Sequence, residues 1–241
     1  MLNDLLTVAR RELFELVMPE GRFRGGAKNV LILAGIAGLL FPLQTGPRWL
    51  TSWNSIYTAC FPVIVLLNYA ADTFAGERER HTLETLLASR LPDAAILLGK
   101  VFAIVGFGWA LILLSQMLAV VGLTAVYGRG RLLFFDPAIA LSLLVIAAVL
   151  PLVLTAAGVL FSMTAPTVRS AGQRMLVPFV VIYGLPSVAP FLIRRFNLTP
   201  NVSVIAPAAI VTVVALTGTV LSVILLVVAM RLFEREKLVL S

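Results

Sequence analysis

The longest apolar run in the chain covers residues 94–127 and reads AAILLGKVFAIVGFGWALILLSQMLAVVGLTAVY. A helix needs about 20 residues to cross a hydrocarbon core about 30 Å thick, so this run is long enough to span a bilayer and must tilt or protrude from it. The chain of 241 residues is 60% hydrophobic and only 13% charged, unlike soluble globular domains. We therefore expect an integral membrane protein.

Further apolar segments flank this run on both sides. Together they predict six spans, at 29–45, 49–71, 94–127, 137–165, 173–193 and 207–230. Asp136 followed by Pro137 is a helix start signal, and Pro151 is expected to kink the fourth span. Six spans leave no room for a second globular domain. The fold class predicted is all-α integral membrane, with one transmembrane domain over 29–231 and a cytoplasmic tail over 232–241.

The N-terminal segment, residues 1–28, has a different pattern. Its apolar residues recur every three or four positions while charged residues fill the other face, which predicts an amphipathic helix. Such a helix lies in the membrane interface, and Pro19 and Gly21 end it. Two roles stay open for this helix: a simple interfacial anchor, or a contact with a cytoplasmic partner.

The distribution of basic residues predicts the orientation. Fourteen of the 19 lysine and arginine residues fall on one side of the expected spans, the side that also holds both termini. By the positive-inside rule both termini are cytoplasmic, in a multi-pass protein of the cell inner (plasma) membrane. The basic residues form short clusters beside the spans, so the counter-charge expected for the net charge of +7 is membrane lipid and no nucleic acid.

Several kinds of chemistry are missing from the sequence. The expected spans contain essentially no ionisable residues, which disfavours an ion-coupled carrier. There is no GxxxxGK[ST] loop for nucleotide phosphates and no GxSxG motif. With one histidine and one cysteine, a multi-histidine or cysteine metal site is excluded within the monomer. We expect no catalytic residue, no metal and no cofactor on this chain, and a source of free energy outside it.

The connection between the second and third spans, residues 72–100, reads DTFAGERERHTLETLLASRLPDAAILLGK. It resembles the signature region of ABC-2 type transporter permeases. The matching residues are Phe74, Gly76, Glu77, Arg78, Glu79, Thr82, Leu83, Glu84, Leu86, Leu87, Gly99 and Lys100. Two positions depart from the family pattern: His81 replaces a common glycine, and Arg90 a common proline.

The resemblance implies a homodimer or heterodimer of six-helix permease subunits. A short coupling helix, about 77–91, would contact a separate ABC ATP-binding subunit that holds ATP and Mg. The residues expected to make this contact are Glu77, Arg78, Glu79, Arg80, Thr82, Leu83, Glu84, Leu86 and Leu87. From composition alone, a solvated turn below the membrane explains the charged GERER segment equally well.

Polar residues in the second span allow two interpretations. They can bond to neighbouring helices, or they can line a substrate path. In the family that the chain resembles, spans two and five are thought to border this path, which implies Asn68 and Tyr183 as candidates.

The function expected is that of the permease subunit of an ATP-driven exporter for a hydrophobic or amphipathic substrate. The alternatives are a non-transporting membrane scaffold or anchor for a cytoplasmic partner, and an ion-coupled carrier.

Overall fold

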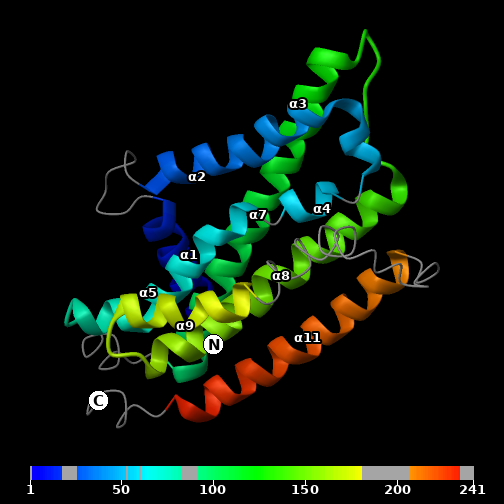
Figure 1. Ribbon diagram of the computed structural model, residues 1–241. Coiled ribbons are helices and arrows are strands. Elements are labelled where there is room, and N and C mark those ends of the chain that lie inside the picture. The colour runs from blue at the N-terminus through cyan, green and yellow to red at the C-terminus, as the bar shows by residue number, and fades with distance from the viewer. Residues whose placement is uncertain are drawn as a thin grey trace.

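A computed structural model describes residues 2–17, 26–52, 54–59, 61–82, 92–180 and 207–233. Every regular element in these ranges is a helix. Three long helices dominate the arrangement: α7 (Asp93–Tyr127), α8 (Pro137–Thr164) and α11 (Pro207–Leu232). In Figure 1 they run roughly along one another, and α8 packs against both α7 and α11. The all-helical class predicted from the sequence agrees with this part of the chain.

Helix α8 begins as its sequence predicts. The side chain of Asp136 accepts a hydrogen bond of 2.9 Å from the Ala138 amide, and Pro137 occupies the first turn, where a missing amide proton costs nothing. Pro151 lies inside the helix without ending it. At the start of α7, by contrast, Pro92 is the capping position and Asp93 is already helical.

The N-terminal part of the domain is made of short helical pieces. In chain order they are α2 (Gly26–Gly35), the π-helix η2 (Ile36–Leu40), α3 (Phe41–Thr45), the 3-10 helix η3 (Gly46–Thr51), α4 (Asn54–Ala59), the 3-10 helix η4 (Phe61–Val63) and α5 (Ile64–Glu79). Gly46 has a φ of +73°, a left-handed conformation that suits glycine and marks the change from α3 to η3.

Four helical stretches of the described residues are long and apolar enough to cross a membrane: Val30–Thr51, Asp93–Tyr127, Pro137–Thr164 and Val211–Leu232. They correspond to the expected first, third, fourth and sixth spans. The expected second span, 49–71, is divided among η3, α4, η4 and α5, and α5 continues about two turns past Asp72. Six spans therefore remain a prediction.

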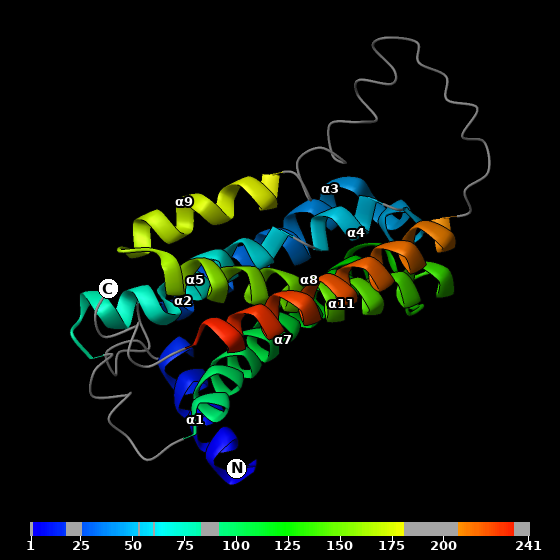
Figure 2. The same cartoon turned by 90° about the horizontal axis from the view of Figure 1, so that it is seen from below.

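The other two helices lie against this framework. Helix α1 (Leu2–Val17) packs on α7, and α9 (Val168–Phe179) packs on α5 and α8, as Figure 2 shows. The segment expected as the fifth span, 173–193, overlaps the end of α9, which begins five residues earlier. Residues 181–206 lie outside the described ranges.

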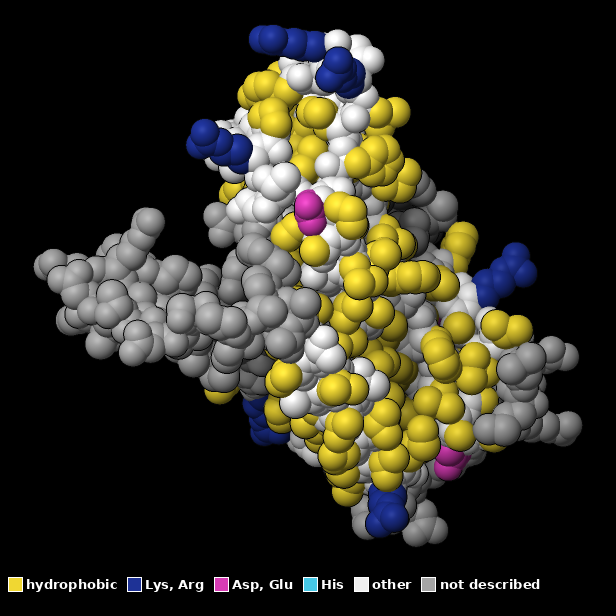
Figure 3. Space-filling view, turned by 90° about the vertical axis from the view of Figure 1, so that its right-hand side faces the viewer, with side chains coloured by type: hydrophobic (Ala, Val, Ile, Leu, Met, Phe, Trp, Pro, Cys, Tyr) yellow, Lys and Arg dark blue, Asp and Glu magenta, His cyan; other side chains and the backbone are white. Residues whose placement is uncertain are grey.

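Small residues bring the helices close together. A methyl group on Gly158 of α8 would collide with the Cβ of Ala70 on α5, and one on Gly108 of α7 would collide with Leu66. Close backbone approach of this kind is typical of helix packing in lipid. The outer face of α11 is apolar, with Leu216 63% exposed, and Figure 3 shows hydrophobic side chains over much of one face of the molecule. Such a surface is compatible with lipid and unsuited to water.

Candidate functional site

The candidate site is the end of α5, where the signature segment Gly76–Arg80 lies. Residues 77–79 form the last turn of α5 and Arg80 is its C-terminal cap. The helix that was expected over 77–91 therefore shares its first three residues with α5. Residues 83–91 lie outside the described ranges, so a separate helix there stays a prediction.

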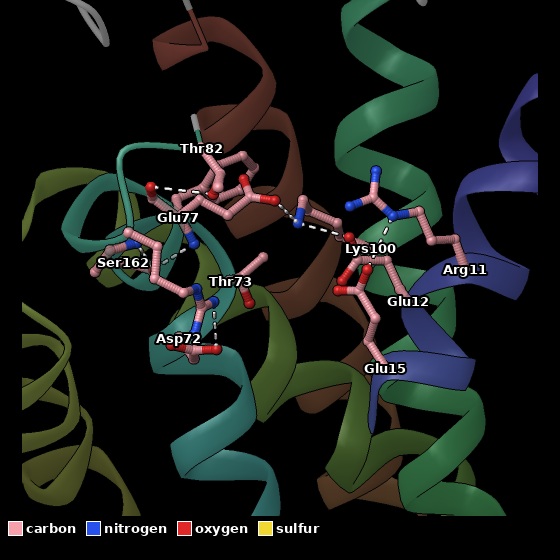
Figure 4. Close-up of polar contacts among 12 residues, drawn as sticks. Arg11, Glu12, Glu15, Asp72, Thr73, Glu77, Thr82, Lys100 and Ser162 are labelled. Carbon is pink, nitrogen blue, oxygen red and sulfur yellow. Dashed lines mark hydrogen bonds and ion pairs between the residues drawn. The ribbon is translucent and has the colours of Figure 1, made fainter. Parts of the chain in front are cut away.

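Glu77 forms an ion pair with Lys100 of α7. Its Oε1 lies 2.9 Å from the Nζ of Lys100, and the Oε1 of Glu12, on α1, lies 2.8 Å from the same nitrogen. Figure 4 shows Lys100 between the two carboxylates, which approach from different helices. The ammonium also lies 5.6 Å from the centre of the Phe74 ring, within the range of a cation–π contact. We call Glu12, Glu77 and Lys100 the ionic triad.

The ionic triad is largely shielded from solvent. The side chain of Lys100 is 2% exposed, and those of Glu12 and Glu77 are 19% and 15% exposed. Burial raises the pKa of Glu77 above its ordinary value, while the charge of Lys100 acts in the opposite direction. A charge at such a depth is tolerated when it is paired, and Lys100 has two partners.

Arg78 and Glu79 connect α5 to the junction between α8 and α9. The guanidinium of Arg78 donates to the carbonyl oxygens of Ala165, at 2.7 Å, and Met163, at 3.1 Å. Carbonyl groups at a helix C-terminus lack partners within the helix and carry partial negative charge, so a cation there is favourable. Glu79 Oε1 accepts a hydrogen bond of 2.9 Å from the Val168 amide at the start of α9.

The C-terminus of α5 closes in a Schellman-type turn. The amide of Thr82 donates to the Glu77 carbonyl at 2.9 Å, and the amide of His81 donates to the Arg78 carbonyl at 3.1 Å. In this motif the residue after the cap is left-handed, and His81 has a φ of +56°. This geometry explains why a glycine suits the position that His81 occupies here.

Two further side chains, those of Arg80 and Ser162, stabilise the C-terminal part of α5. Arg80 pairs with Asp72 at 2.9 Å, and a Cβ on Gly76 would collide with that Asp72 carboxylate. On the buried side, Ser162 of α8 donates to the Ala71 carbonyl at 2.7 Å and accepts from two amides of α5, at 2.9 Å each. The hydroxyl of Ser162 thus joins α8 to the backbone of α5.

The sequence-predicted site residues fall into three groups. Glu77, Arg78, Glu79 and Arg80 are brought together at the end of α5, each with a partner inside the chain, and Thr82 follows in the closing turn. Asn68 is exposed on α5. The remaining candidates, Leu83, Glu84, Leu86, Leu87 and Tyr183, lie outside the described residues.

Sequence reasoning missed Glu12 and Ser162, and it predicted no partner for Lys100. Lys100 was already among the residues of the family pattern, as was Glu77. Because opposite charges in such a pattern often pair, their shared presence was the available signal. Glu12 and Ser162 carry no comparable signal, since each is one polar residue on an otherwise ordinary helix.

In the part of the chain that the structure describes, no group of three His, Cys, Asp or Glu residues could hold a metal ion. Ion pairs and hydrogen bonds join the end of α5 directly to α7, to α9 and to the end of α8, and through Lys100 of α7 to Glu12 on α1. These features define a multi-pass helical membrane protein in which the C-terminal end of α5 is held by neighbouring helices.

Comparison with known protein families agrees with this class. The family described as ABC-2 family transporter protein matches residues 14–211, most of the chain. The chain belongs to this family, whose members are membrane components of ABC transporters, and membership implies association with an ABC ATP-binding subunit. No curated protein matches the chain.

Proposed function

We propose that this chain is the permease subunit of an ATP-driven ABC-2 exporter. A separate subunit would bind and hydrolyse ATP with Mg, and this chain would convert the resulting motion into export of a hydrophobic or amphipathic substrate. The cycle would alternate between inward and outward openings as rigid helices shift against one another. Family membership supports the permease role, and the braced end of α5 supports the mechanical coupling.

The observation that carries the proposal is the contact set of Glu77, Arg78 and Glu79. A force applied to the connection over 83–91 would reach α5 at its C-terminus. There it would pass directly to α7 through Glu77, to α8 through Arg78 and to α9 through Glu79. A solvated turn without internal partners would dissipate such a force, because flexible side chains and loops absorb displacement.

The complex proposed contains two permease subunits, as a homodimer or heterodimer, in the cell inner membrane with both termini cytoplasmic. Asn68, exposed on α5, is a candidate for the substrate path together with Tyr183. The partner-contacting residues proposed are those of the connection itself, above all Leu83, Glu84, Leu86 and Leu87, since the charged residues before them are engaged within the chain.

The first experiment is a mild-detergent purification of the tagged chain. We expect an ATP-binding subunit to co-purify stoichiometrically, with vanadate-sensitive ATPase activity that changes when the chain is present. A stable complex without ATPase activity would favour a non-transporting scaffold, and a partner-free oligomer whose transport responds to an ionophore would favour an ion-coupled carrier.

A second experiment locates the contact with the partner subunit. Replacing Leu86 and Leu87 together by Asp is expected to abolish co-purification while the chain still inserts and folds. The matched control is Leu132→Asp, an exposed leucine (70%) near Arg131 in the connection between α7 and α8, on the side expected to face away from the cytoplasm. Co-purification that survives the Leu86 and Leu87 changes would remove the connection from the proposed interface.

A further inference from the structure

We propose that Lys100 is a positioning residue that makes α1 move as one body with the C-terminal end of α5 and the first turns of α7. This inference rests on the proposed function, because it concerns how motion from an ATP-binding subunit spreads through the chain. In this proposal α1 moves during the transport cycle, and the ionic triad is the link that moves it.

The contact of α1 with α7 includes two neighbouring residues, Gly99 and Lys100. A Cβ at Gly99 would lie 2.7 Å from Val8 Cγ1 and 2.8 Å from Val8 Cβ, so the glycine allows α1 to approach α7 closely. Four residues after Val8 on the same face of α1, Glu12 reaches Lys100. Close packing and an ion pair thus hold α1 at one place on α7.

The same lysine holds the end of α5. Glu77 bonds to Lys100 through its side chain and accepts the Thr82 amide through its carbonyl oxygen, at 2.9 Å in both cases. The far end of the connection is Asp93, where α7 begins, about two turns before Lys100. Both ends of the connection therefore lead to the ionic triad within a short length of rigid helix.

Because the ionic triad is buried, separating α1 from α7 during the cycle would be costly. Separating α1 from α7 would leave Lys100, 2% exposed, with one carboxylate and would expose Glu12 without its cation. Lys100 would keep Glu77 but lose its hydrogen bond to Glu12, and a buried group that loses a charged hydrogen-bond partner is destabilised. The triad therefore stays closed through the cycle, and a displacement of the C-terminal end of α5 carries α1 with it.

The test compares the ionic triad, which is buried and joins three helices, with an exposed ion pair that lies within α1. The key variant, Glu12→Gln with Glu77→Gln and Lys100→Met, removes all three charges and keeps side-chain length, so that no uncompensated charge unfolds the chain. The matched control, Arg11→Met with Glu15→Gln, removes an ion pair of 2.9 Å on the exposed side of α1. Lys100→Arg keeps the cation.

The first measurement uses the chain alone in detergent. Spin labels at Arg10→Cys on α1 and His81→Cys after α5, in a Cys60→Ala background, report the distance between the two helices. We expect one narrow distance distribution for the parent, for Lys100→Arg and for the Arg11 and Glu15 control, and a broadened one for the triad variant. A narrow distribution in the triad variant would show that packing alone holds α1, and would overturn the proposal.

The second measurement uses the complex with its ATP-binding subunit, and follows substrate transported per ATP hydrolysed. The triad variant is expected to lower this ratio about fivefold or more, the usual scale of a lost coupling between sites, while Lys100→Arg and the control keep it. An unchanged ratio with broadened distances would also overturn the positioning role. If no ATP-binding subunit exists, the proposed function fails, whereas the distance measurement still decides whether the triad holds α1.

Discussion

Glu79 caps the first turn of α9: its Oε1 accepts a hydrogen bond of 2.9 Å from the amide of Val168. The two residues are 89 positions apart in the sequence: Glu79 is the last residue of α5, and Val168 is the first residue of α9. Together with Thr167, whose side chain accepts from the Ser170 amide, Glu79 satisfies amides that α9 cannot satisfy by itself. The start of α9 is thus set by α5 as well as by its own sequence.

Replacing Glu79 by Ala is expected to lower stability by about 0.5–1 kcal/mol, because an exposed cap and a favourable charge at a helix N-terminus are lost together. Thermal unfolding in detergent measures the change. The control is Glu15→Ala, which removes a carboxylate from an exposed pair within α1 and is expected to cost no more than about 0.5 kcal/mol. Equal effects of the two variants would contradict the capping role.

Ser162→Ala is expected to destabilise the protein by about 1–3 kcal/mol, since a buried carbonyl and two amides of α5 lose a partner. Ser142 offers a matched control on the same helix. It is also buried, but among the described residues its hydroxyl bonds within its own helix, to the Ala138 carbonyl. If Ser142→Ala lowers stability in thermal unfolding as much as Ser162→Ala does, the hydrogen bonds of Ser162 to α5 contribute no more than a bond within one helix.

His81→Gly is expected to stabilise the protein by about 0.5–1 kcal/mol, because a left-handed backbone strains a residue with a Cβ. His81→Ala keeps the Cβ and should bring no gain. Chemical denaturation of the purified chain compares the three proteins. A loss of stability in the glycine variant would mean that the imidazole makes a favourable contact that outweighs the strain.

Gly99→Ala is expected to weaken the docking of α1, since the added methyl would press on Val8. Limited proteolysis should release the N-terminal segment faster from this variant than from the parent. Gly106→Ala, on the same helix with nothing within 4 Å of its Cβ position, should leave α1 protected and gain about 0.5–1 kcal/mol of helix stability. Restored protection in a Gly99→Ala, Val8→Ala double variant would confirm the steric cause.

The pH dependence of stability should contain a contribution from Glu77. Burial raises its pKa above the ordinary value of 4.5, so the folded chain binds this proton more tightly than the unfolded chain does. The contribution is fully present below 4.5 and is lost as the pH rises through the folded pKa. Parent and Glu77→Gln should therefore differ in the slope of unfolding midpoint against pH above 4.5. Parallel slopes would contradict the shift.

The outline of the fold was predictable where one physical signal dominates. The apolar run over 94–127 became α7 almost residue for residue, because lipid requires every backbone group to be bonded within its own helix. Asp136 caps α8 as expected, since a cap depends on residues a few positions away. The resemblance to ABC-2 permeases around Gly76–Arg80 was also visible in the sequence, and the family match over 14–211 confirms the family.

The second expected span shows where such prediction fails. Hydropathy treats 49–71 as one segment, yet η3, α4, η4 and α5 divide it, and α5 runs on through charged residues to Glu79. Glu77, Arg78 and Glu79 continue the helix because each has a partner outside α5, as Arg78 has in the Ala165 carbonyl. Hydropathy counts a charge as solvated and cannot register a partner that is distant in the sequence.

The sequence by itself determined that the chain is a helical membrane protein of the ABC-2 class, since apolar length and a local signature motif are properties of contiguous residues. Only the tertiary structure decided what the charged residues of that motif do. Glu77, Lys100 and Glu12 lie on three helices, and whether they meet depends on how closely α1 packs at Gly99. A charge buried among its partners links three helices, whereas the same charge left in water would link none, and that difference exists only in three dimensions.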